Sequence, residues 1–238
     1  MLNAVNCLSP RRQRGLGLVE MMVGLALGLF IVGGALAMFS TFTTDNRQLL
    51  QEARIVQDLR ATADLITRDL RRAGYWGDAS SGVWASGGSS TPPKSNYGFM
   101  AAAPCASATL NQKTTAAASS SLCFSIAQDA NNAVGSDERF GFELDSGVIY
   151  SVVGGAARLA LSDPKSITIT DLVITPSSQV LPVSDFCAKT CTVNCPEVVV
   201  REFEVLIKGH LPGDTAASRF QRSNVRLRND YVGGACPA

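Results

Sequence analysis

The sequence predicts an α+β fold in which one long amino-terminal helix packs on an antiparallel sheet, with long loops and disulfide bonds. Three observations support this prediction. An uncharged apolar segment is followed by an amphipathic segment with helical spacing, alternating apolar residues typical of strands occur in the carboxyl-terminal half, and six cysteines lie far beyond the apolar segment. An apolar helix face and an apolar sheet face each need cover, and packing them together covers both.

The charge balance argues against nucleic acid as a partner. The 238-residue chain has a formal net charge of +1, with 21 basic and 20 acidic side chains. Arg11, Arg12 and Arg14 stand directly before the apolar segment, and subtracting these three from the 21 leaves 18 basic side chains against 20 acidic ones. The rest of the chain is therefore slightly acidic, and we expect no basic face for a polyanion.

The apolar segment is long enough to cross a bilayer. No charged residue occurs between Glu20 and Asp45, and these 24 residues would extend about 36 Å as an α-helix. We therefore interpret residues 16–44 as the transmembrane half of the helix. Because the arginines precede it, the positive-inside rule places the first residues in the cytoplasm and the rest of the chain on the other side. The alternative is a removed signal peptide, although the segment is long for one and lacks an A-x-A-like end.

Glu20 is the unusual residue of this segment. It stands at the head of the apolar run, where a carboxylate is costly and is usually kept for a partner. The simpler interpretation places Glu20 among lipid headgroups beside the arginines, and physics alone leaves both interpretations open.

Residues 45–74 are predicted to form the amphipathic half of the same helix. Arg71 and Arg72 suit the last turn of a helix, and Gly74 is a typical terminating residue. Tyr75 and Trp76 follow and are expected to cover the helix exit by ordinary packing. A dimeric coiled coil after a single-pass anchor is the alternative, but fewer than four heptads precede Gly74. The apolar residues that recur at steps of three or four are Leu49, Ala53, Val56, Leu59, Ala63, Ile66, Leu70 and Ala73.

Residues 75–238 are predicted to form a β-rich globular domain. The stretch 77–121 is rich in Gly, Ser, Ala and Pro, which indicates a long irregular surface connection. The sequence "DSG" at 145–147 favours a tight hairpin. Strands are expected at 122–126, 139–144, 148–153, 166–174, 198–209 and 223–229.

The six cysteines after the apolar segment favour disulfides in an oxidising compartment. We expect Cys105 to pair with Cys123, and Cys236 to pair with one of the triplet Cys187, Cys191 and Cys195, whose other two members pair together. The C-x3-C-x3-C spacing of the triplet leaves zinc as an alternative, which an oxidising compartment disfavours.

Motifs for catalysis or cofactor binding are missing from the sequence. His210, the one histidine, has no triad pattern around it, and neither a P-loop nor an H-E-x-x-H motif occurs. The stretch "DANNAVGSDE" at 129–138 lacks the register of a calcium loop. We therefore expect no enzymatic activity, no cofactor and no metal.

The stretch "RQRGLGLVEMMVGLALG" resembles the class III signal of type IV pilins and of the pseudopilins of type II secretion. In that family a prepilin peptidase cuts after the glycine of a basic leader, and the fifth mature residue is glutamate. The resemblance implies that residues 1–15 are the leader, that cleavage lies between Gly15 and Leu16, and that Glu20 acts in assembly. Leu16 replaces the more common phenylalanine, and no proline occurs between residues 16 and 74.

The phrase "ITRDLRRAGYWG" at 66–77 resembles minor pilins of the PilW type and, more loosely, J-type minor pseudopilins. The resemblance to minor pilins of the PilW type implies the pilin fold and amino-terminal methylation. It also implies an inner-membrane precursor with a periplasmic domain, which then enters the extracellular pilus and serves twitching motility and adhesion.

The partners that this resemblance implies are other minor pilins, the major pilin, a large tip adhesin, prepilin peptidase and inner-membrane lipid. The expected function is a non-enzymatic minor pilin that initiates pilus assembly and sits at the tip. The alternatives are a J-type pseudopilin of type II secretion and a membrane-anchored envelope protein that does not polymerise.

Overall fold

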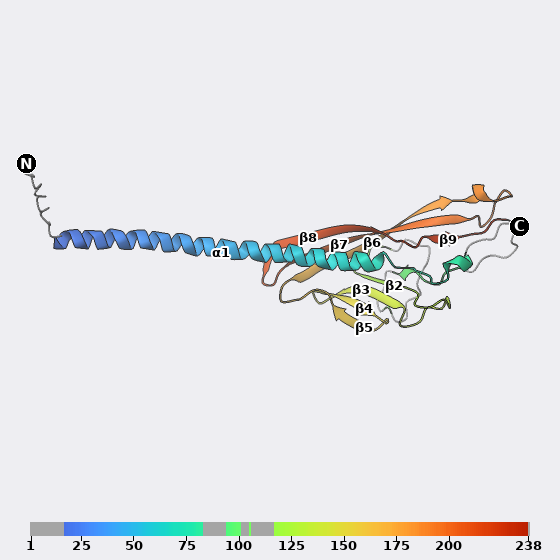
Figure 1. Ribbon diagram of the computed structural model, residues 1–238, viewed down its shortest axis with the longest axis horizontal. Coiled ribbons are helices and arrows are strands. Elements are labelled where there is room, and N and C mark those ends of the chain that lie inside the picture. The colour runs from blue at the N-terminus through green and yellow to red at the C-terminus, as the bar shows by residue number, and fades with distance from the viewer. Residues whose placement is uncertain (1–16, 83–93, 101–104, 106–116, 238) are drawn as a thin grey trace, which may run out of the picture. The chain divides into compact units, whose positions relative to one another are not determined.

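The computed structural model describes residues 17–82, 94–100, 105 and 117–237 (Figure 1). Gly15 and Leu16, and with them the predicted cleavage point, lie outside the described residues. The chain forms two compact units, residues 1–50 and residues 51–238, and each is described by itself.

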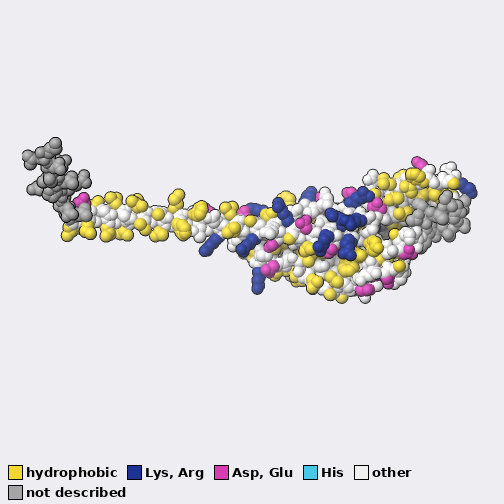
Figure 2. Space-filling model, in the orientation of Figure 1, with side chains coloured by type: hydrophobic (Ala, Val, Ile, Leu, Met, Phe, Trp, Pro, Cys, Tyr) yellow, Lys and Arg dark blue, Asp and Glu magenta, His cyan; other side chains and the backbone are white. Residues whose placement is uncertain are grey.

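The first unit contains the amino-terminal part of one continuous helix, α1 (Leu18–Leu70). Its large apolar side chains are exposed along this part, and α1 is long and apolar enough to cross a membrane. Apolar side chains cover most of the helix face seen in Figure 2. The hydroxyls of Thr41, Thr43 and Thr44 each donate to the carbonyl four residues earlier, at 2.8–3.2 Å. These polar side chains are thus satisfied within the helix itself.

In the second unit, α1 presents one buried face. The buried positions in this stretch follow a helical spacing of three and four. Two predicted members of the stripe, Leu49 and Ala53, are instead exposed, and Val56 is only partly buried. Ala53 lies two steps of three residues before Leu59, which places the two side chains about 120° apart around the helix axis. Ile55 lies four residues before Leu59 and therefore stays on the same face. The buried apolar residues of α1 are Ile55, Leu59, Ala63, Ile66 and Leu70.

Two antiparallel sheets complete the second unit, so the α+β prediction is confirmed with two sheets in place of one. The first has the order β1-β2-β3-β4-β5, and the second has the order β6-β7-β8, with β9 also paired to β7. The first sheet consists of β1 (Phe99–Met100), β2 (Ser121–Ser125), β3 (Arg139–Asp145), β4 (Val148–Val153) and β5 (Ala157–Ala160). The second consists of β6 (Thr168–Pro182), β7 (Glu197–Leu211), β8 (Asp214–Arg226) and β9 (Tyr231–Gly233), and two short 3-10 helices lie at Ala79–Gly82 and Ser184–Phe186.

The hairpin predicted at "DSG" is present between β3 and β4. Asp145 pairs with Val148, and Ser146 and Gly147 have φ of 50° and 80°. Positive φ at both central residues is the type I′ geometry that matches the twist of the flanking strands.

Three strands are additional to those predicted. β1 and β9 are only two and three residues long, too short to show alternation, and all four residues of β5 are exposed. β1 also lies inside the predicted irregular stretch 77–121. β6 continues beyond its predicted end through Pro176, which is tolerated because β6 lies at the edge of its sheet.

The main apolar core joins the buried face of α1 to the inner faces of both sheets, and two smaller clusters lie outside it. Phe99 of β1 and Phe203 of β7 meet edge to face, with ring centroids 4.8 Å apart. This contact connects the two sheets directly. The helix and the two sheets of the second unit are therefore packed around one main core.

Candidate functional site: an amino-terminal helix and a cross-linked globular domain

Glu20 lies in the first turn of α1, two residues after Leu18 begins the helix. The positive end of the helix dipole lies here, which favours a carboxylate. The backbone is already helical at this point, because the Met21 N–H donates to the Gly17 carbonyl at 3.1 Å. Glu20 is exposed, so its carboxylate is accessible to a partner.

The helix surface around Glu20 is apolar, and glycines without side chains interrupt its large apolar residues. Leu18, Met21 and Met22 are each at least 65 % exposed. A Cβ added at Gly24 or Gly28 would meet nothing within 4 Å. Such small residues allow another helix to approach closely, and the large apolar residues beside them fit lipid or a second apolar helix.

The carboxyl end of α1 is tied to the first sheet. Gly74 has a φ of +72°, the left-handed conformation that ends helices, and its N–H donates to the Ser125 carbonyl at 2.9 Å. The Ala127 N–H donates to the Tyr75 carbonyl at 2.9 Å. The strand β2 and the residues just after it therefore receive the chain as it leaves the helix.

The same helix end is also tied to the second sheet. The Asn229 side-chain amide donates to the carbonyls of Arg72 and Ala73, at 3.3 Å each. The Arg228 N–H donates to the Arg71 carbonyl at 3.0 Å. Carbonyls that the last turn of a helix leaves without an internal partner are thus satisfied.

Arg201 of β7 lies at the centre of this junction. It is 2 % exposed, its Nη2 donates to the Asn229 carbonyl, and its guanidinium lies 5.5 Å from the ring centroid of Phe99. Burial lowers the pKa of Arg201 to about 10, against the opposing effect of Asp230. A Cβ at Gly74 would lie 3.0 Å from Arg201 Nη2. The glycine of the "AGYWG" phrase thus makes room for the arginine as well as ending the helix.

The two aromatic residues after Gly74 have different environments. Trp76 is buried at 8 % exposure, whereas Tyr75 is 46 % exposed. The expected ordinary packing, in the core or at its rim, therefore takes the core form for Trp76 and the rim form for Tyr75.

Glu138 organises the "DANNAVGSDE" loop from inside. It is 3 % exposed and accepts from the Gln128 N–H at 2.7 Å, the Gly135 N–H at 2.9 Å and the Tyr97 hydroxyl at 3.0 Å. Burial alone would raise the pKa of Glu138, but these donors outweigh it and hold that pKa below its usual range. Burial and the same carboxylate raise the pKa of the Tyr97 hydroxyl. The loop is therefore held by an internal carboxylate.

Three disulfides cross-link the described part of the second unit. Cys105 pairs with Cys123, Cys187 with Cys236, and Cys191 with Cys195. These are the pairs expected from the sequence, and within the triplet the partner of Cys236 is Cys187. Because all three triplet thiols are in disulfides, the zinc alternative has no thiolates to use.

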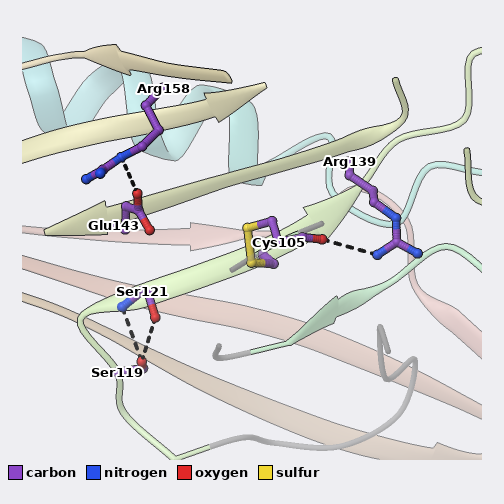
Figure 3. The surroundings of a disulfide bond; sticks show 7 residues. Cys105, Ser119, Ser121, Arg139, Glu143 and Arg158 are labelled. Carbon is purple, nitrogen blue, oxygen red and sulfur yellow. Dashed lines mark hydrogen bonds and ion pairs between the residues drawn. A yellow bond between two sulfur atoms is a disulfide. The ribbon is translucent and has the colours of Figure 1, made fainter. Parts of the chain in front are cut away.

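The Cys105–Cys123 disulfide fastens Cys105 onto the first sheet (Figure 3). The Arg139 guanidinium donates to the Cys105 carbonyl at 3.2 Å. A Cβ at Gly141 would collide with Cys105 Sγ, so the glycine between the two phenylalanines of "FGF" gives the disulfide its place. On the same sheet Arg158 forms an ion pair with Glu143 at 2.6 Å, and the Ser121 N–H donates to Ser119 Oγ at 3.2 Å (Figure 3).

The structure thus locates the predicted residues in two places. Glu20 belongs to the first unit, and the six cysteines belong to the second. Arg201, Asn229 and Glu138 were not predicted. Arg201 had a signal, because it occupies the inward-facing phase of β7 together with Val199 and Phe203.

An apolar amino-terminal helix that continues into an α+β domain with antiparallel sheets defines a pilin-like protein. The chain belongs to the prepilin peptidase-dependent protein B family, which matches residues 48–227. The prokaryotic N-terminal methylation motif matches residues 10–36, which include Gly15, Leu16 and Glu20. No curated protein and no solved structure matches the chain.

Removing each disulfide separately should destabilise the second unit in a fixed order. The loops closed by Cys187–Cys236, Cys105–Cys123 and Cys191–Cys195 span 49, 18 and 4 residues. Loop-closure entropy then gives losses of about 4, 3 and 2 kcal/mol for the double Cys→Ser variants. Denaturant unfolding of the unprocessed chain, followed by near-ultraviolet circular dichroism, measures them, with Cys7→Ser as the matched control. An inverted order would contradict the pairing.

Replacing Glu138 by glutamine should make stability less dependent on pH. Because the folded pKa lies below the unfolded value of about 4.3, the carboxylate stabilises the fold above that value and loses this effect as pH falls through the folded pKa. We expect Glu138→Gln to lose about 1–3 kcal/mol at pH 7, a difference that shrinks below about pH 4. Glu202→Gln, at an exposed position, is the control. A constant difference from pH 7 to pH 3 would contradict this account.

Proposed function

We propose that this protein is a minor pilin of a type IV pilus, non-enzymatic and of the PilW type. The observation that carries the proposal is the position of the methylation motif. It spans the basic leader and the first turns of α1, where Glu20 stands exposed at the head of an exposed apolar helix. A cleavage signal, a carboxylate and an assembly helix thus follow one another within the matched residues.

In this proposal the chain has four functional segments. Residues 1–15 form the leader that prepilin peptidase removes between Gly15 and Leu16. Residues 16–44 are held by inner-membrane lipid and later by neighbouring helices, and residues 45–74 connect them to the periplasmic domain at 75–238. Lipid and filament core both accept the exposed apolar side chains of α1.

Glu20 provides the register of assembly in this proposal. Cleavage before Leu16 creates a free amine four residues ahead of Glu20, on this chain and on every neighbouring pilin. A carboxylate in an apolar filament core is costly unless it is paired, and an ammonium group is its natural partner. The pair forms only when two helices stand at one axial offset, so Glu20 favours that offset.

The proposed tip position and partners are supported by the sequence at the end of α1. The phrase "DLRRAGYWG" resembles the PilW type, and Gly74 in it has a physical role beside Arg201. This resemblance supports a place in the complex that initiates the pilus, with other minor pilins, the major pilin and a large tip adhesin. After assembly the protein would leave the inner membrane for the extracellular filament.

The proposal is tested with two variants in the native host. Gly15→Leu should block processing, so that mass spectrometry finds the full precursor in place of a methylated chain beginning at Leu16. Glu20→Ala should be processed and inserted normally but should fail to support piliation. Glu20→Asp keeps the charge and should retain partial assembly, and Glu202→Ala is the exposed control. Normal piliation with Glu20→Ala would refute the register role.

A deletion strain separates this proposal from its alternatives. Loss of surface pili and twitching supports the pilus function, whereas loss of exoprotein secretion with pili intact indicates a J-type pseudopilin. An uncleaved, unmethylated amino terminus in the wild-type protein would indicate an anchored envelope protein that does not polymerise.

A further inference from the structure

The strand β5 is an edge of the first sheet, because β4 pairs with one side of it and no strand pairs with its other side among the described residues. The pairing with β4 continues one residue past β5, since the Leu161 N–H donates to the Ile149 carbonyl at 2.8 Å. In an antiparallel pair, every second residue directs its backbone groups to the neighbouring strand. Leu159 therefore bonds toward β4, whereas Arg158 and Ala160 direct their N–H and carbonyl groups away from it.

These outward backbone groups are available for pairing. The N–H and carbonyl groups of Arg158 and Ala160 have no hydrogen-bond partner among the described residues, and all four residues of β5 are exposed. Water can satisfy the groups in the isolated protein. Donors and acceptors that alternate along a strand edge also match the backbone of an extended segment, which is the geometry of β-strand addition.

Apolar side chains continue to this edge. Leu159 is 60 % exposed, and Val153, its diagonal neighbour on β4, is 38 % exposed. Because side chains alternate along a strand, both lie on the face of Ile149, which belongs to the main apolar core. One further strand with an apolar side chain on this face would cover Leu159.

The charge on β5 does not protect its edge. Charged side chains and prolines are common devices against pairing at an edge strand. The Arg158 guanidinium is turned back over its own sheet (Figure 3), where it pairs with Glu143 at 2.6 Å and with Asp145 at 2.9 Å. It also lies 4.2 Å from the ring centroid of Tyr150. The approach to the β5 backbone is therefore left open.

The edge strands of the second sheet are better protected. β6 contains Pro176 and Pro182, and its Ile174 already forms a bridge to Ser119. β8 carries three arginines, at positions 219, 222 and 226. By comparison, β5 contains no proline, and its one charged side chain is engaged within the sheet.

We propose that β5 is the docking edge for an extended segment of a neighbouring pilus protein, which adds one strand to the first sheet. This inference rests on the proposed function, which places other pilins beside this domain. The segment carries an apolar residue opposite Leu159, and its backbone bonds to Arg158 and Ala160. Lipid chains would cover Leu159 but would leave the backbone groups unsatisfied.

The test cross-links the full chain in its native host. The photoreactive amino acid p-benzoylphenylalanine replaces Ala157, on the same face as Leu159, and mass spectrometry identifies the adducts. We expect an adduct with one segment of another pilus protein. Ala160→Pro removes an outward N–H without removing a bond to β4, so the yield should fall about fivefold or more, the effect of losing one hydrogen bond. Ala160→Thr keeps the N–H and should keep the yield.

A second pair of variants tests the edge without proline. Leu159→Lys places a charge at an exposed position, so the unfolding midpoint should hardly change while the adduct yield falls. Leu159→Met is its matched control and should keep the yield. Circular dichroism and the unfolding midpoint of every variant exclude misfolding.

Two results would overturn the docking edge while leaving the proposed function intact. One is a processed, folded chain that supports piliation but gives no protein adduct, or an adduct with lipid only. The other is an adduct whose yield is unchanged in both Ala160→Pro and Leu159→Lys. An unprocessed wild-type chain would instead refute the proposed function itself.

Discussion

The Asn229 side chain donates to two carbonyls at the end of α1, and the rest of the globular unit depends on this contact. Arg201 lies directly beneath it and donates to the Asn229 carbonyl, while Gly74 leaves the room that the guanidinium needs. On the opposite side the Gly74 N–H bonds to Ser125 of the first sheet. Helix end, first sheet and second sheet therefore share one hydrogen-bonded junction, and loss of any member would leave buried polar groups unsatisfied.

The two parts of α1 have opposite environments, although they form one continuous helix. Around Ile66 the helix covers its apolar face with the inner faces of both sheets, and the core is closed. Around Leu25 it leaves its apolar side chains exposed, so this part requires lipid or other protein to cover it. The proposed function accounts for both, because a precursor held in the membrane would later pack this part of its helix with other helices.

Local patterns predicted most of the fold, and contacts between distant segments account for what they missed. The helical spacing of apolar residues around Leu59 predicted the helix, and the apolar alternation in β3 and β7 predicted these strands. The turn sequence "DSG" predicted the hairpin. The division into two sheets depends on which strands pair, which periodicity does not encode. β5 was missed because all its residues are exposed, so it carries no apolar alternation.

The candidate site divides in the same way. Cysteine count and spacing predicted the disulfides, whereas the assembly role that a local motif indicates for Glu20 stays a prediction. The roles of Asn229 and Glu138 arise from partners far away in sequence, such as Arg72 and Tyr97. Arg201 was visible as a charge in the buried phase of β7, but only the structure shows that it supports the helix end.

The threonines near the end of the first unit bear on where the apolar segment of α1 ends. Thr41, Thr43 and Thr44 look like the start of a water-exposed region, but their hydroxyls are already bonded to the helix backbone. They can therefore enter hydrocarbon at low cost. Asp45 is the first charged side chain after Glu20. In the proposed membrane-held precursor, α1 would therefore enter the bilayer as far as Thr44, and Asp45 would fix the depth of insertion.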